Sequence, residues 1–529
     1  METHLNSENI SIQDLADEVL VSRQKPSDQY EVAALLESNG WSDQLAKEKF
    51  GVENVFDLSK LVWKTMKQNV VYAPFTPMKN ILLKRYSVSF FRYFFKGAVF
   101  ALPMAISVFS MLTLKFSLWS YESFNTELAT AIAIGTILSF LSIGGFTQAI
   151  ARQGYGHIRQ GYFGIAKLTT FFFVRWGYIL SLAVVAILII ANLLLGIFTG
   201  KMLTIIVLYY FILNAIWLSV TIMYILDYEL IFSGLLVLGI GIIFVLFKIF
   251  KINIIASQLI SLAIVAILGG IIALLIFTIK GRKKKKDEIE PSMQRKTIIL
   301  NTVFHYFIYG FSYFAYLFTD RIIAWSTNDV YMPYVIWFRG EYELGLDFAL
   351  LILIIPMGFV EFIIRSMMNS ISKAQKDYYM YEVDKMHRRY YRMYIFRLLL
   401  ILLFAILSGI LVYILVILIR KNYFPMIDIG ISDTTFFVFI IALIGYAFTA
   451  MGLLNVEIMF CVAQPKMATK TILPGLLTTI VVGFILSRVI HYSYAVVGLL
   501  AGSIVFFAVG GVFVVKLLKK LDYYLYMAS

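Results

Sequence analysis

Six charged residues stand inside or at the edge of long apolar stretches of this 529-residue chain. A charged side chain costs roughly 2.5–3.5 kcal/mol to place in a membrane helix, so each needs a partner or a water-filled path. The six are Arg175, Asp320, Arg321, Glu361, Arg365 and Glu457. Carboxylates in such positions can bind a cationic sugar or a proton, and guanidinium groups can hold an acidic sugar or a diphosphate.

A structural role is the alternative for each of these charges. Glu361 and Arg365 are four residues apart, so they share one helix face and can form an ion pair that only locks helices together. Asp320 and Arg321 are interpreted as an outer gate or a structural pair. Arg175 and Glu457 are interpreted as cavity-lining residues, with helix packing as the competing explanation.

Motifs of catalysis are absent from the sequence. It has no phosphate-binding loop ending in Gly-Lys-Ser/Thr, no His-Glu-x-x-His and no Gly-x-Ser-x-Gly. The five His residues are scattered, and the single Cys461 excludes an intramolecular disulfide and a Cys-rich metal site. The sequence therefore predicts a protein that is not an enzyme, with no cofactor and no metal.

The composition predicts a membrane protein. Hydrophobic residues make up 60% of the chain and charged residues 15%, well below the quarter that soluble domains carry. The formal charge is +14, but the basic residues lie between apolar stretches. Such a pattern indicates membrane topology rather than nucleic-acid binding.

Twelve apolar stretches predict an all-α polytopic membrane protein. The runs are continuous, whereas strands of a membrane barrel would alternate. The predicted spans are 89–113, 125–150, 169–198, 203–225, 230–250, 254–279, 298–319, 346–364, 398–419, 435–461, 471–487 and 494–515.

Charge counts give the orientation. With the N-terminus inside, the cytoplasmic connections hold 24 Lys and Arg residues and the outer connections hold 9. Because cytoplasmic loops are enriched in basic residues, both termini are predicted to be cytoplasmic. No early segment looks like a cleavable signal peptide. The chain is therefore expected in the cytoplasmic (inner) membrane as a multi-pass protein.

Four regions follow from these patterns: a cytoplasmic helical module over 1–88, a first six-helix half over 89–280, a basic linker over 281–297 and a second six-helix half over 298–520. Within the module, three short helices are expected near 28–38, 43–50 and 53–66. The module is interpreted as a small cap on the protein or as a docking site for a cytoplasmic glycosyltransferase or regulator.

Two further features bear on transport. Pro103, Pro356 and Pro474 fall inside predicted spans, where each removes a backbone hydrogen bond, as in the broken helices of transporters. The segment 326–347 is predicted to be an outer loop. It combines aromatic residues with carboxylates, a mixture that suits sugar rings but also an ordinary solvated loop.

The sequence resembles the PelG family of exopolysaccharide exporters, within the multidrug/oligosaccharidyl-lipid/polysaccharide (MOP) superfamily. The resemblance covers roughly 89–520 and departs at 1–88. The matching residues include Asn214, Trp217, Asp227-Tyr228, Asp320-Arg321, Ile354-Ile355-Pro356, Glu361 and Tyr378-Tyr379. It implies twelve helices in two lobes around a central cavity, and a flippase-type export of a polysaccharide or its lipid-linked precursor.

Two other functions stay open at this point. One is a cation-coupled small-molecule antiporter of the same superfamily, similar to MATE transporters. The other is a non-transporting membrane scaffold for a polysaccharide synthase, held through the N-terminal module. Polysaccharide or lipid-linked sugar and membrane lipid are the expected partners, and nucleic acid is not.

The topology can be tested by cysteine labelling from outside intact cells, in a Cys461→Ala background. The 24-to-9 bias predicts that an impermeant reagent misses cysteines placed at 284 and 520 and modifies one at 329. Labelling at 284 from outside would overturn the predicted orientation.

Overall fold

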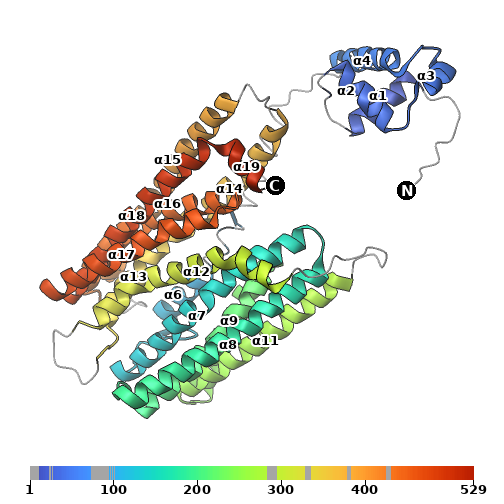
Figure 1. Cartoon of the computed structure of the whole chain (residues 1–529). Helices are drawn as coiled ribbons and strands as arrows, with labels where there is room; N and C mark the ends of the chain where they lie inside the picture. The colour runs from blue at the N-terminus through green and yellow to red at the C-terminus, as the bar shows by residue number, and fades with distance from the viewer. Residues whose placement is uncertain are drawn as a thin grey trace. The chain divides into compact units, whose positions relative to one another are not determined.

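The computed structural model describes residues 11–22, 26, 28–72, 94–95, 97, 99, 102–282, 295–327, 335–377, 383–423 and 430–528 (Figure 1). The Lys283–Lys286 run of the predicted linker and Tyr378-Tyr379 lie outside these residues. The chain divides into two compact units, Met1–Val88 and Ser89–Ser529.

The N-terminal unit contains four helices: α1 (Ile12–Ser22), α2 (Gln29–Ser38), α3 (Asp43–Phe50) and α4 (Val55–Tyr72). The three predicted helices are present, and α1 is a fourth that the sequence reading missed. Asp28 caps α2 by accepting from the Glu31 N–H at 2.9 Å. Leu15, Val32, Leu36 and Leu58 are fully buried in a shared apolar core, so the unit has a small core of its own.

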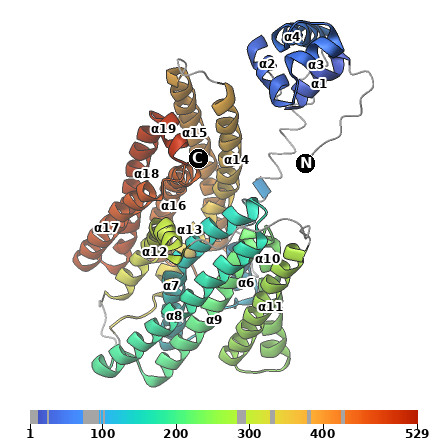
Figure 2. The same ribbon diagram turned by 45° about the vertical axis from the view of Figure 1, so that its right-hand side comes forward.

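The second unit is built from long helices that run back and forth (Figures 1 and 2). They are α6 (Leu102–Leu114), α7 (Thr126–Arg159), α8 (Phe163–Leu195), α9 (Gly200–Ile225), α10 (Glu229–Ile243) with a π-helical turn Phe244–Ile249, α11 (Ile254–Arg282), α12 (Lys296–Trp325), α13 (Gly340–Leu350), α14 (Ile354–Asp377), α15 (Val383–Arg420), α16 (Asp433–Cys461), α17 (Pro465–Val489), α18 (Ala495–Leu518) and α19 (Leu521–Ala528).

Eleven helical segments of the described residues are long and apolar enough to cross a membrane. They coincide with the second to twelfth predicted spans. In the place of the first, the described part contains the shorter apolar helix α6. The described chain has one isolated bridge, Phe116 to Tyr121, and otherwise helices. The protein is therefore an all-α, integral multi-pass membrane protein.

Local chemistry explains where the spans begin and break. Asn125, Thr199 and Ser432 each accept a backbone N–H with the side chain and so cap α7, α9 and α16. Pro356 has no N–H to donate to the Ile352 carbonyl four residues before it. The Ser408 hydroxyl of α15 donates to that carbonyl instead, at 2.9 Å. A 3₁₀ turn at Leu351–Leu353 therefore separates α13 from α14 within one span.

The eighth span starts earlier than the sequence reading placed it. That reading began the span at 346, but the helical segment that crosses the membrane runs over Gly340–Met368. Glu343 and Asp347 therefore belong to a helix of a span and not to an outer loop. The prediction of a loop was wrong here. A carboxylate every few residues made the segment read as polar, although Tyr342, Leu346 and Ala349 form a buried apolar face of the helix.

The two halves meet along glycines. At Gly310 of α12, an added Cβ would overlap the backbone of Gly144 in α7. At Gly97, a Cβ would lie 2.8 Å from the Gly358 Cα of α14. Small residues allow such backbone approach between membrane helices. The two contacts join α7 to α12 and Gly97 to α14.

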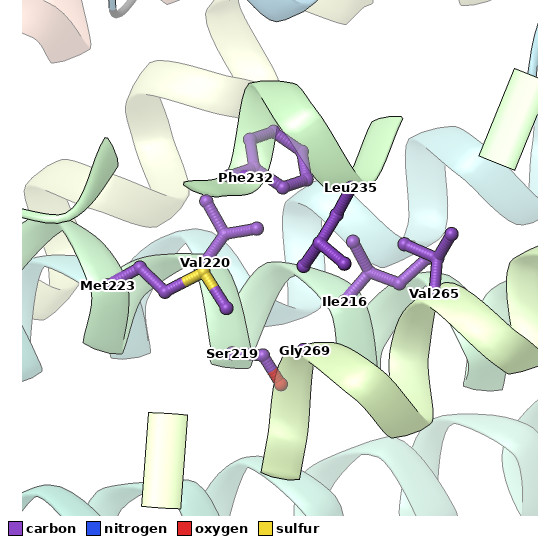
Figure 3. A pocket seen from close by; sticks show the side chains of 8 residues that line it. All are labelled: Ile216, Ser219, Val220, Met223, Phe232, Leu235, Val265 and Gly269. Carbon is purple, nitrogen blue, oxygen red and sulfur yellow. The ribbon is translucent and has the colours of Figure 1, made fainter. Parts of the chain in front are cut away.

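The first half also contains a packing gap. Figure 3 shows Ile216, Ser219, Val220, Met223, Phe232, Leu235, Val265 and Gly269 around it. The gap is lined by apolar surface and is too narrow for water. A Cβ on Gly269 would meet Ser219 at 3.4 Å, which is ordinary contact.

These two kinds of glycine predict opposite mutational effects. Gly310→Ala should lower the melting temperature, because overpacking costs about 1–3 kcal/mol where backbones touch. Gly269→Ala should keep or raise it, since Ala exceeds Gly by about 1 kcal/mol in a helix and fills the gap. Thermal unfolding of both purified variants in detergent tests this, and equal effects would contradict the α7–α12 contact.

Candidate functional site

The C-terminal end of α12 and the N-terminal part of α13, on the predicted outer side, bring four charged side chains together. The Arg321 guanidinium donates to the Glu343 carboxylate, and its Nη2 lies 3.6 Å from Asp347 Oδ1. Trp325 Nε1 donates to the other Glu343 oxygen at 2.9 Å. Asp320 accepts from the Tyr342 hydroxyl at 2.8 Å. We call Asp320, Arg321, Glu343 and Asp347 the outer cluster.

The outer cluster holds one arginine against three carboxyl groups. Asp320 is fully buried and Glu343 is 6% exposed, so both are removed from bulk solvent. Among the described residues, Asp320 Oδ1 and Arg321 Nε have no hydrogen-bond partner. A low-dielectric site cannot hold two uncompensated negative charges cheaply. This cluster is therefore suited to bind a proton or another positive group.

Two further arginines near these residues have structural partners. Arg339 Nε donates to the Ala324 carbonyl at 3.1 Å, and its guanidinium stacks 3.8 Å from the Tyr492 ring centroid. Arg488 donates to the Ile323 carbonyl at 3.2 Å. Both groups satisfy carbonyls at the C-terminal end of α12, where cations are favoured.

A second group of charges lies deeper in α14. Arg365 Nε donates to Glu361 Oε1 at 2.5 Å, and the two side chains are 30% and 27% exposed. The predicted i,i+4 pairing is confirmed. The Glu361 Cβ lies 2.9 Å from where a Cβ on Gly97 would be, so the first span passes directly beside this pair.

Glu457 is exposed in the middle of a buried stretch of α16. Met451 to Val456, Ile458 and Met459 are all buried around it. The carboxylates of Glu457 and Glu361 are close enough to interact electrostatically. The next residues on that side of the helix, Phe460 and Cys461, are partly exposed as well. We call Glu361, Arg365 and Glu457 the inner cluster.

A stripe of tyrosines on α12 connects the two clusters. Tyr306, Tyr309, Tyr313, Tyr316 and then Asp320 follow at steps of three and four, so they share one helix face. Tyr309 and Tyr313 interact electrostatically with Glu457, and Tyr316 does so with Asp320. A polar column thus runs through the apolar core of the second half.

Hydroxyl groups secure the middle of this column. The Tyr316 hydroxyl lies 2.9 Å from Thr449 Oγ1 of α16 and 2.6 Å from Ser503 Oγ of α18. Such buried networks fix helices in one register when their members are paired. α12, α16 and α18 are therefore held together by polar contacts as well as by apolar packing.

The first half contributes aromatic rings to its boundary with the second half. Phe140 of α7 stacks on Phe314 and Phe318 of α12, with centroids 5.2 and 5.3 Å apart. Its other neighbour is Trp217 of α9, at 4.5 Å. At the inner end, Arg152 of α7 lies over the Tyr306 ring at 5.5 Å. The boundary between halves is therefore lined with aromatic faces.

Arg175 stands apart from the other five predicted residues. It is exposed on α8, a helix of the first half. Only 6% of the most apolar 18-residue segment of α8 is buried. The described residues give its guanidinium no carboxylate partner. The interpretation of Arg175 as a cavity residue stays a prediction.

The structure also adds residues that the sequence reading did not select. Glu343 and Asp347 were assigned to a loop, although their i,i+4 spacing fits one helix face. The tyrosine stripe has a period of about 3.5 residues in the sequence, a signal that could have found it. Among the described residues, no three His, Cys, Asp or Glu side chains are grouped to hold a metal ion.

Comparison with known proteins gives a fold but no sequence family. No protein-family profile matches the chain, and no curated protein matches it. The Vibrio cholerae MATE transporter VcmN in its bent form is 13% identical, with a TM-score of 0.55 over 83% of this chain and 99% of that one. A MOP superfamily transporter from Pyrococcus furiosus is also 13% identical, with a TM-score of 0.54 over 81% and 96%.

A third structure extends this likeness. It is an inward-facing multidrug resistance MATE family transporter of the MOP superfamily, 12% identical, with a TM-score of 0.52 over 80% of this chain and 98% of that one. The chain thus has the fold found in MATE transporters of the MOP superfamily. At these identities the likeness concerns the fold alone.

The outer cluster predicts a large difference between two Arg–carboxylate pairs. Glu343→Gln leaves Arg321 buried beside a weaker partner, so we expect a loss of about 3–5 kcal/mol. Asp433→Asn removes an ion pair with Arg420 that is 2.5 Å long but exposed. It should change the melting temperature little. Similar melting temperatures for the two single variants would refute this ranking.

Proposed function

We propose that this protein exports a polysaccharide or its lipid-linked precursor across the cytoplasmic membrane. The observation that carries the proposal is the accessible Glu457 carboxylate within a buried stretch of α16, beside Glu361. A carboxylate kept accessible at membrane depth is a mark of a substrate or ion path. The MATE-type fold and the resemblance to PelG support a transporter of this superfamily.

The charges of the two clusters favour a neutral or cationic cargo. Arg365 is paired with Glu361, and Arg321 is paired with Glu343. The exposed carboxylates of the two clusters are Glu457 and Asp347, the latter 51% exposed and 3.6 Å from Arg321. Carboxylates accept hydrogen bonds from hydroxyl and ammonium groups, as in an amino sugar, and repel phosphate.

A cation-coupled small-molecule antiporter is the second candidate. The excess of carboxyl groups over arginine in the outer cluster favours it, because such a site can exchange a proton or cation with each transport cycle. Deletion of the gene separates the two functions. Loss of a secreted polymer supports the exporter, and loss of tolerance to toxic cations with normal polymer supports the antiporter.

The inner cluster gives the direct test of transport. Glu457→Gln and Glu361→Gln should each reduce export by roughly tenfold, since a hydrogen bond to a charged group contributes about 1.5–3 kcal/mol. Membrane abundance should change much less. Secreted polymer is measured against the amount of protein in the membrane.

The matched control for these variants is Glu341→Gln, which changes an exposed glutamate at the start of α13. It should export normally. If Glu457→Gln and Glu361→Gln also secrete at the wild-type level, both carboxylates are structural and the proposed path is wrong.

The N-terminal unit is proposed to recruit a cytoplasmic partner, a synthase or a regulator. Its core is small, and units of this size tend to gain stability by docking. Tyr30 of α2 and Phe56 of α4 are 64% and 50% exposed. Their rings pack edge to face, with the ring centroids 6.4 Å apart. Exposed paired aromatic rings are common anchors of protein interfaces.

Deletion of residues 1–70 separates the two roles of this unit. We expect normal membrane abundance, lost co-purification of cytoplasmic partners and reduced export. The variant Tyr30→Ser/Phe56→Ser should reproduce the loss of partners without the deletion. Lost abundance instead identifies the unit as an internal cap, and normal export with unchanged partners excludes both roles.

A further inference from the structure

The start of α15 and the end of the chain pack into one corner of the second half. Met386 and Tyr390 of α15 share an apolar core with Leu517 of α18 and Leu521 of α19. His387 Nε2 lies 2.8 Å from Asp522 Oδ1, so a polar contact also joins α15 to α19. The surface of this corner is therefore carried by packed helices and not by a loose tail.

The outside of this corner is strongly basic. Six exposed Lys and Arg side chains cover it: Arg388, Arg389, Arg392, Lys516, Lys519 and Lys520. Exposed tyrosines accompany them, with Tyr523 at 53% and Tyr526 at 82%. The turn between α7 and α8, at the corresponding place in the first half, contains Arg152, Arg159 and Lys167.

The position of the basic corner places it at the surface of the bilayer. α15 has 38 residues and is about 57 Å long, far more than the roughly 30 Å of hydrocarbon that it crosses. Its first turns therefore extend beyond the hydrocarbon. Lys519 and Lys520 follow directly on the last residue of α18, and tyrosines are enriched at this level of membrane proteins.

We propose that the basic corner is a binding site for the headgroups of anionic phospholipids in the adjoining leaflet. Clusters of four to eight Lys and Arg residues at the end of a span attract anionic lipid. The tyrosines fit the same environment, because the ring enters the acyl boundary while the hydroxyl stays in the headgroups. Lipid held there fixes α15, α18 and α19 at the membrane surface.

The test uses the full-length protein in a mild neutral detergent and follows its melting temperature as phosphatidylglycerol is added. Phosphatidylcholine is the uncharged comparison. The variant Lys516→Gln/Lys519→Gln/Lys520→Gln removes half of the basic corner. Its matched control, Lys201→Gln/Lys248→Gln/Lys251→Gln, removes three exposed lysines from connections at the opposite ends of the spans.

Phosphatidylglycerol should raise the melting temperature of the wild type and of the control variant, and high salt should abolish the rise. In the corner variant, the apparent affinity for this lipid should fall about fivefold for each charge removed. If the corner variant unfolds in detergent, Arg388→Gln/Arg392→Gln replaces it in the same titration.

Two results would overturn the proposal. One is an unchanged response of both corner variants to phosphatidylglycerol. The other is a wild type that ignores phosphatidylglycerol but is stabilised by poly-glutamate, which identifies the corner as a surface for an acidic protein.

Discussion

The need to neutralise Arg321 without water organises the second half of this protein. A buried guanidinium is tolerated only beside carboxylates with good geometry. Glu343 and Asp347 provide these from α13, so α13 must lie against the end of α12. That placement starts the eighth span at Gly340 and puts Tyr342 within reach of Asp320. Backbone polar groups in the membrane also need hydrogen-bond partners. The Ser408 hydroxyl donates a hydrogen bond to the Ile352 carbonyl that Pro356 leaves unpaired.

The two halves differ in the side chains that they contribute. The outer cluster, the inner cluster and the tyrosine stripe all belong to helices α12 to α16. The first half presents Phe140 and Trp217 to the boundary, and glycines where α7 meets α12. One half therefore holds the charged groups that can bind a cargo, and the other offers an apolar, aromatic surface that makes few specific bonds to them.

Hydropathy and caps were sufficient to predict most elements of the fold. Continuous apolar runs predicted eleven of the spans that the described residues contain, and Asp28 and Ser42 predicted the starts of α2 and α3. Placement of side chains was less predictable. The i,i+4 rule found Glu361–Arg365 because both lie on one helix. It could not find Arg321–Glu343, because that pair depends on how α13 packs against α12, and spacing along the sequence contains no such information.

α12 is the element through which the halves can influence each other. On one of its faces, the Tyr316 hydroxyl forms hydrogen bonds with Thr449 of α16 and Ser503 of α18. An adjacent face meets α7 through Gly310 and the stacked rings of Phe314 and Phe318. Hydrogen bonds between buried groups resist sliding because they are directional, whereas glycine and aromatic contacts can shift at little cost. A movement between halves should therefore carry α12 with α16 and α18 and take place at the α7–α12 boundary, which keeps both carboxylate clusters intact.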